Sequence, residues 1–197
     1  DLKFNIIKGL TFTSSNGVDY YNNTSYSFTP QAVNGAGKNS MGNSNLQRML
    51  LQSSNNITYN HTWNDKHYLT VTGVWEATKS TIRNMGISGS SLQAESVGWW
   101  DVKNAVTRDA TNGYSDWALL SGVGRVIYNY DNRYMLTGTF RADGSSRFTN
   151  DKWGYFPSVA VAWTASNESF MESTRDLISN LKIRASYGVI GLSLIHI

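Results

Sequence analysis

The chain has 197 residues, a formal net charge of +3, 7 Trp, 11 Tyr and no Cys. The absence of Cys excludes disulfides, thiolate zinc sites and cysteine nucleophiles. Its basic residues are too scattered for a nucleic-acid-binding patch, and its many aromatic residues exclude a disordered chain. No run of the sequence approaches the ~18 apolar residues that a membrane-spanning helix requires.

The dominant pattern is an alternation of apolar and polar residues with a period of two, which indicates β-strands. Lys8 breaks the apolar set of the first strand, which otherwise consists of Leu2, Phe4, Ile6, Leu10 and Phe12. In chain order, the pattern predicts seven strands over residues 2–13, 47–63, 67–78, 120–130, 133–143, 157–165 and 181–189.

The connections between these strands alternate in length. Segments 64–66 and 131–132 are tight turns by composition, and 166–180 is intermediate, with a helical turn expected at 168–172. The segments rich in Ser, Asn and Gly are longer and cover 14–46, 81–114 and 144–154. Short turns on one side and long loops on the other are typical of an outer-membrane barrel, whose short turns lie in the periplasm.

Alternation alone leaves two architectures open, because a soluble β-sandwich also places apolar residues on one face of each strand. Strands longer than ten residues fit a tilted membrane span of ~9–11 residues. Aromatic residues beside the short turns fit the girdle at one membrane interface. They are Tyr59, Trp63, Tyr128, Tyr130, Tyr134 and Trp163. The sequence therefore favours an all-β, antiparallel transmembrane β-barrel segment. The alternative is a secreted β-sandwich that binds carbohydrate through exposed aromatic residues.

Charged residues also occur within the predicted strands, on the polar face. They are Arg125, Arg141, Asp143 and Arg184. A water-filled or plugged barrel interior accommodates such side chains. We expect these four to face the lumen or a plug and not to act as substrate ligands.

No catalytic or cofactor-binding constellation is apparent, and His61, His67 and His196 lack the spacing of a metal site. We therefore expect no enzyme activity and interpret His61 and His67 as interfacial residues.

The outer segment 81–114 contains Trp99, Trp100 and Asp101. Paired tryptophans beside a carboxylate would suit stacking on a sugar or contact with a lid protein, since aromatic anchors are typical of contact surfaces. Packing within the loop is the alternative.

Two motifs follow each other closely in the second half of the chain: Arg-Ala-Asp-Gly-Ser-Ser-Arg-Phe at 141–148 and Gly-Tyr-Phe-Pro-Ser at 154–158. Together with Leu-Lys-Ile-Arg-Ala-Ser-Tyr-Gly at 181–188, they resemble the barrel of SusC/RagA-type TonB-dependent transporters. The similarity is strong over 119–191 and looser over 47–80. The segments 14–46 and 81–114 carry no recognisable signature.

The resemblance implies a plugged barrel of roughly 22 strands, of which residues 1–191 would form part. Signal peptide, TonB box and plug would lie outside this sequence. The resemblance further implies an outer-membrane location in contact with lipids, and import of glycans, oligopeptides or similar nutrients. The implied partners are the TonB complex and a SusD-like surface lipoprotein. Residues 192–197 depart from the family pattern, and we expect a non-native tail there.

Overall fold

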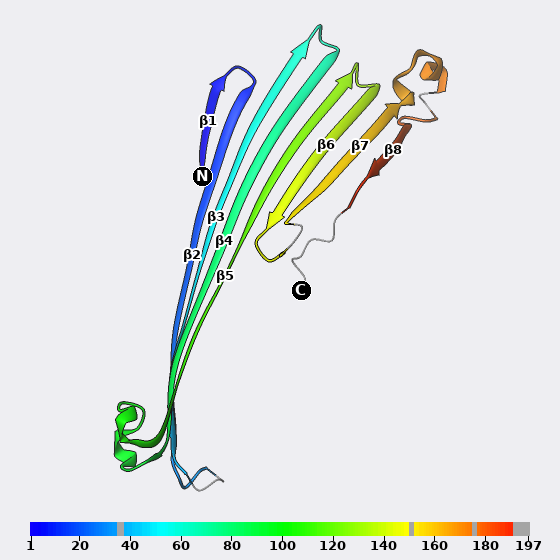
Figure 1. Cartoon of the computed structure of the whole chain (residues 1–197). Coiled ribbons are helices and arrows are strands. Elements are labelled where there is room, and N and C mark those ends of the chain that lie inside the picture. The colour runs from blue at the N-terminus through cyan, green and yellow to red at the C-terminus, as the bar shows by residue number, and fades with distance from the viewer. Residues whose placement is uncertain (35–37, 150–151, 175–176, 191–197) are drawn as a thin grey trace. The chain divides into compact units, whose positions relative to one another are not determined.

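The structure is a computed structural model that describes residues 1–34, 38–149, 152–174 and 177–190. Its eight strands form one antiparallel sheet in chain order, from β1 to β8 (Figure 1). The strands are β1 (Leu2–Ile7), β2 (Leu10–Thr29), β3 (Ser40–Trp63), β4 (His67–Leu92), β5 (Ala105–Tyr130), β6 (Tyr134–Ser145), β7 (Trp153–Thr164) and β8 (Lys182–Gly188). The short 3-10 helices are η1 (Glu95–Val97), η2 (Val102–Asn104), η3 (Ala165–Asn167) and η4 (Ser169–Thr174). Among the described residues, no helix has the length and apolar character needed to cross a membrane.

The predicted fold class is confirmed, but the predicted number of strands is wrong. The first predicted strand is two strands, because Lys8 and Gly9 form a tight turn between Ile7 and Leu10. Gly9 has a φ of 85°, which matches the third position of a type II turn and favours glycine there. The helical turn expected at 168–172 is present as part of η4.

Two of the three predicted long loops are mostly strand. The connection between β2 and β3 is confined to residues 30–39, and that between β4 and β5 to residues 93–104. The paired segments were missed because Asn, Ser and Thr interrupt the apolar residues along their strands, which leaves no sustained apolar alternation. Their side chains bond across the strands: Asn45 donates to Asn22 Oδ1 at 2.7 Å and to Thr24 Oγ1 at 2.9 Å.

The chain divides into two compact units. Each of the strands β2, β3, β4 and β5 contributes residues to both units. Unit 1 comprises residues 1–16, 52–78 and 118–197, and unit 2 comprises residues 17–51 and 79–117. Unit 2 has a small core in which Met41, Leu92 and Ala105 are buried, with Phe28 and Val102 packed against them.

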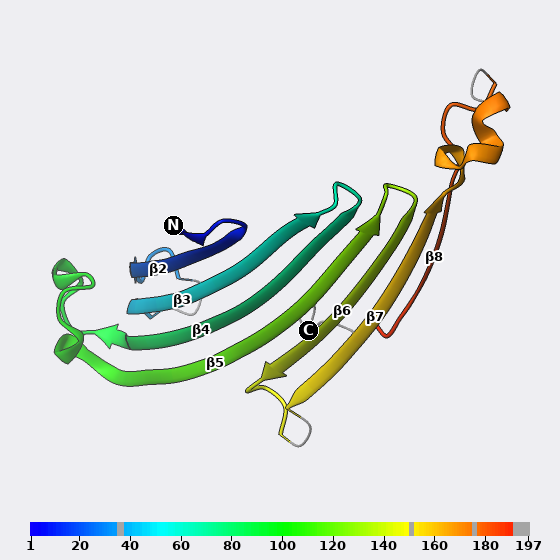
Figure 2. The same cartoon turned by 90° about the horizontal axis from the view of Figure 1, so that it is seen from above.

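In unit 1, the register separates the residues of β5–β8 onto two faces, because directly opposed residues of an antiparallel pair point to the same side. Strands β6, β7 and β8 lie side by side in both views (Figures 1 and 2). One row of Cα partners joins Val126, Gly138, Val159 and Tyr187, and the next joins Ile127, Thr137, Ala160 and Ser186. The apolar face thus collects Leu120, Val126, Tyr128, Tyr130, Tyr134, Leu136, Phe140, Trp153, Tyr155, Val159, Val161, Trp163, Ile183 and Tyr187. This confirms the predicted alternation in these strands.

The structure does not support the β-sandwich alternative. In the described part of the chain, all eight strands belong to a single sheet, and Ala165 is the only hydrophobic residue of unit 1 that is buried. Leu136, Val159 and Val161, which a sandwich would pack into its core, are about half exposed. None of the described residues therefore covers the apolar face of unit 1.

Candidate membrane-facing surface and outer-loop aromatic cluster

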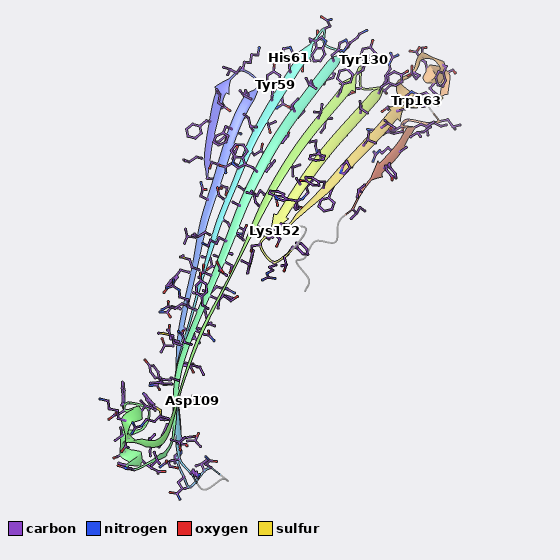
Figure 3. All side chains as sticks on the ribbon, in the orientation of Figure 1. Tyr59, His61, Asp109, Tyr130, Lys152 and Trp163 are labelled. Carbon is purple, nitrogen blue, oxygen red and sulfur yellow. The ribbon has the colours of Figure 1, made fainter. Side chains whose placement is uncertain are left out.

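The six aromatic residues predicted as a girdle lie together beside the short turns of unit 1. Figure 3 shows Tyr59, His61, Tyr130 and Trp163 at this end, with Lys152 at the far end of the β6–β7 pair. Ring contacts link the row: Tyr59–His61 at 5.9 Å, His61–Trp63 at 5.6 Å, Trp63–His67 at 5.0 Å, His67–Tyr130 at 4.9 Å and Tyr130–Tyr134 at 6.4 Å. Tyr134 is the Cα partner of Trp163. His67 Nδ1 also lies 2.7 Å from Tyr128 Oη. His61 and His67 therefore both belong to this aromatic row.

A carboxylate anchors the end of the aromatic row. Glu168, in the connection after β7, accepts hydrogen bonds from Tyr134 Oη at 2.7 Å, Trp163 Nε1 at 3.1 Å and Arg133 Nη1 at 3.3 Å. Its side chain is only 12% exposed. Arg133 also pairs with Asp131 Oδ2 at 3.2 Å. The hydrogen bond from Tyr134, followed by those from Trp163 and the charge of Arg133, holds the pKa of Glu168 below its ordinary value. No pattern in the sequence identified this residue, because its donors come from the β5–β6 turn and from strands β6 and β7.

The lowered pKa of Glu168 predicts an acid-sensitive connection between β7 and β8. A carboxylate with a lowered pKa in the folded state stabilises above its unfolded pKa, and this stabilisation is lost as pH falls through the folded value. We expect amide-exchange protection of residues 165–174, corrected for intrinsic rates, to drop on acidification. Glu168→Gln should remove most of that protection at neutral pH and flatten the pH dependence. The control is Glu172→Gln in the same connection, which should behave like the unsubstituted protein; equal profiles for both variants would contradict the prediction.

A second aromatic row lies on the same face, further from the short turns. Trp153 is the Cα partner of Gly144, ten residues along β6 from Tyr134. Tyr155 stacks on Phe140 at 6.1 Å. A separate group of rings lies in β1, β2 and β4, where Phe12, three residues after Gly9, stacks on Phe4 at 6.4 Å and on Trp75 at 5.8 Å. Trp153 and Tyr155 were not predicted as part of a girdle, because Trp153 lies in the predicted loop 144–154 and Tyr155 stood out only as part of the motif at 154–158.

The four charged residues predicted to face the lumen share the polar face of unit 1. Arg125 opposes Thr139, Arg141 opposes Val123, Asp143 opposes Ser121, and Arg184 opposes Ala162. Arg141 Nε donates to Asp143 Oδ2 at 2.7 Å, and Arg125 Nε donates to Thr139 Oγ1 at 3.3 Å. The register therefore brings all four to one side of the sheet, opposite the apolar face.

In unit 2, the two predicted tryptophans are joined by a third ring. Trp99 and Trp100 are 5.9 Å apart, and Tyr26 lies 6.4 Å from the first and 6.5 Å from the second. Asp101 does not join them, because its Oδ1 accepts the Lys103 amide at 2.9 Å and caps η2. Tyr26 was not predicted, since it lies in a segment without a readable pattern. We call Tyr26, Trp99 and Trp100 the outer-loop aromatic cluster.

Comparison with known proteins places this geometry in a family. No family model matches the chain. The TonB-dependent receptor P39 of Formosa agariphila is 34% identical over 194 residues, which are 93% of this chain and 18% of the relative. The TonB-dependent receptor SusC of Bacteroides thetaiotaomicron is 45% identical over 74 residues, or 37% of this chain and 7% of the relative. The chain therefore spans less than a fifth of the length of these relatives.

A solved structure of the RagAB peptide transporter has the same fold. It matches 94% of this chain with a TM-score of 0.80 and 23% identity, using 21% of the transporter chain. The RagAB peptide importer in its open-open state matches with a TM-score of 0.77. Because its sequence relatives are TonB-dependent receptors including SusC and its single sheet matches RagAB, the chain belongs to the SusC/RagA family of TonB-dependent transporters and corresponds to part of their β-barrel.

Proposed function

We propose that this chain forms a membrane-spanning section of the barrel wall of a nutrient importer in the bacterial outer membrane. The observation that carries the proposal is the apolar band of unit 1 between its two aromatic rows. The rows are ten residues apart along β6, or about 33 Å at ~3.3 Å per residue. A strand tilt of ~40° reduces this to a height of about 25 Å, which is that of the apolar band of outer-membrane barrels.

The polar face then borders the interior of the barrel. Arg125, Arg141, Asp143 and Arg184 would face the lumen or a plug, where water or polar partners solvate charged groups. Beside β8, the same face has an open hollow of about 270 Å³ whose lining includes Lys182 and Arg184. Basic side chains on the opposite, lipid-facing side would be destabilising, so this distribution of charge supports the orientation.

The complete transporter would import glycans, oligopeptides or similar nutrients with energy supplied through the TonB complex. Family membership supports this activity and supports pairing with a SusD-like surface lipoprotein. The cargo named for RagAB is peptide. Barrel wall and outer loops are the contributions expected of this chain, without catalysis.

A genetic experiment tests the proposal. In the source bacterium, deletion of the gene that encodes this chain should abolish growth on one polymeric glycan or peptide mixture while growth on the corresponding monomers continues. Complementation should restore growth, and a TonB-deficient strain should lose it again. Detection of the protein in a fraction other than the outer membrane, or growth on all sources after deletion, would contradict the proposal.

A further inference from the structure

We infer that the outer-loop aromatic cluster is a binding platform for an uncharged saccharide, which makes a glycan the cargo class of this transporter. This inference rests on the proposed function, because it assumes that unit 2 meets the cargo before import. The cluster consists of one tyrosine from β2 and two adjacent tryptophans from the β4–β5 connection. Neither segment can form it alone.

The rings of the cluster are available to a ligand. Trp100 is 78% exposed and Tyr26 is 55% exposed, while Trp99 is partly covered. The planes of neighbouring rings differ by 32° to 37°, so no ring covers the face of another as a parallel stack would. Tyrosine and tryptophan offer large, rigid contact areas at a low cost in conformational entropy.

The backbone beneath the rings is held in place. Asn43 Nδ2 donates to the carbonyl oxygen of Trp99 at 3.0 Å, and Asn104 Nδ2 donates to that of Ala94 at 2.8 Å. The Gln93 amide donates to the Asn104 carbonyl at 3.0 Å. The small core of Met41, Leu92 and Ala105 anchors the strand ends on both sides of the connection. Preorganisation of this kind raises affinity, because less conformational freedom is lost when the ligand binds.

The polar atoms of the cluster point to a ligand that is both apolar and hydroxylated. In the described part of the chain, Tyr26 Oη, Trp99 Nε1 and Trp100 Nε1 make no hydrogen bond. A tyrosine or tryptophan combines an apolar ring with one hydrogen-bonding group at its edge. A sugar ring is complementary to this arrangement, since its C–H face can lie on a ring while its hydroxyl groups accept from the ring edges.

The charges nearby favour a neutral ligand over an ionic one. Glu95 Oε1 accepts hydrogen bonds from the Gln31 amide at 2.7 Å and from Asn39 Nδ2 at 3.1 Å. The Arg108 guanidinium donates to the carbonyls of Ala105 at 2.8 Å and Lys103 at 2.7 Å. Glu95 thus links the β4–β5 connection to Gln31 and Asn39, and Arg108 holds two carbonyls at the start of β5. The two cation–π contacts of the described residues involve Tyr21 and Tyr114, so the three rings of the cluster offer a π face and a polar edge and no ion pair.

The test uses the complete transporter, purified in detergent from outer membranes. Three uncharged hexasaccharides (maltohexaose, cellohexaose and laminarihexaose) and one hexapeptide of zero net charge, N-acetylated and C-amidated hexaglycine, are titrated by calorimetry. We expect at least one hexasaccharide to bind and the Trp99→Ala/Trp100→Ala double variant to weaken that affinity about tenfold or more, as for truncation of aromatic hot spots. Tyr114→Ala is the matched control, because Tyr114 is an equally exposed aromatic residue of unit 2 outside the cluster; it should leave the affinity unchanged.

Several results would overturn the inference. They are binding of none of the three hexasaccharides, an affinity that the double variant leaves unchanged, and a loss confined to hexaglycine or to a co-purifying surface lipoprotein. Each of these can occur in a transporter that inserts into the membrane and supports TonB-dependent growth, in which case the proposed function stands. A protein missing from the outer membrane overturns the proposed function and this inference with it.

Discussion

Lysine in place of Val159 is expected to destabilise the membrane-inserted barrel by about 2–4 kcal/mol, the cost of a basic residue at the midplane of a barrel's lipid face. Val159 lies on the apolar face of unit 1, four residues from Trp163 in the first aromatic row and six from Trp153 in the second. Its side chain is half exposed in the chain itself, and its cross-strand partners Gly138 and Tyr187 carry no charge, so in a bilayer the substituted ammonium group would face lipid without a counter-ion.

The neighbouring Ser158 provides a matched control. It is the Cα partner of Thr139 and Gly188 on the polar face. Ser158→Lys would place the same ammonium group toward the barrel interior, where the expected change is within about 0.5 kcal/mol. The comparison isolates the choice of face, since the two variants differ in position by one residue and share strand, charge and depth.

The measurement is the urea concentration at which half of the complete transporter, folded into lipid vesicles, has unfolded. Unfolding is detected as the loss of its heat-modifiable gel mobility. A lower midpoint for Val159→Lys than for Ser158→Lys supports the assigned faces. The reverse order would mean that the polar face meets lipid, and it would remove the argument that places Arg125, Arg141, Asp143 and Arg184 in the lumen. Equal midpoints would mean that neither face meets lipid.

The fold could be predicted where the strands have one apolar and one polar face. Alternation around Val126, Leu136 and Val159 was sufficient to assign the faces of β5–β8 in unit 1. It failed in the parts of β2–β5 that belong to unit 2, where residues such as Asn22 and Asn45 interrupt the apolar pattern. Strand pairing there includes side-chain hydrogen bonds that no periodicity reveals. It also failed at Gly9, because a two-residue turn inside an alternating run looks like an interruption.

The candidate surfaces were predictable to different degrees for a related reason. Aromatic residues beside short turns, such as Tyr130 and Trp163, could be grouped from the sequence because each lies next to its turn in the chain. Tyr26 and Trp100 are separated by more than seventy residues, and only strand pairing brings their rings together. Glu168 depends in the same way on donors from the β5–β6 turn and from two strands. Such clusters need the register, which the sequence did not supply.

The turn between β1 and β2 leads to the second large expected effect. Gly9→Val should destabilise the barrel by about 2–5 kcal/mol through a strained backbone and steric overlap. The φ of 85° at Gly9 is unfavourable for any L-residue and most of all for a β-branched one. A Cβ there would also overlap the Asn60 carbonyl oxygen. Because the Asn60 amide donates to the Gly9 carbonyl at 2.8 Å, relief of the overlap would break the pairing of the turn with β3.

Gly17→Val is the control for this substitution. A Cβ at Gly17 meets nothing within 4 Å, and the residue lies within β2 without a positive φ. Valine suits strands better than glycine does, so Gly17→Val should be neutral or slightly stabilising in the same urea series. Amide exchange adds a local readout: Gly9→Val should expose the amides of β1, which pair with β2 through the register that begins at Ile7 and Leu10. If both variants unfold at the same urea concentration with β1 still protected, Lys8 and Gly9 do not form this turn, and the first predicted strand would be continuous after all.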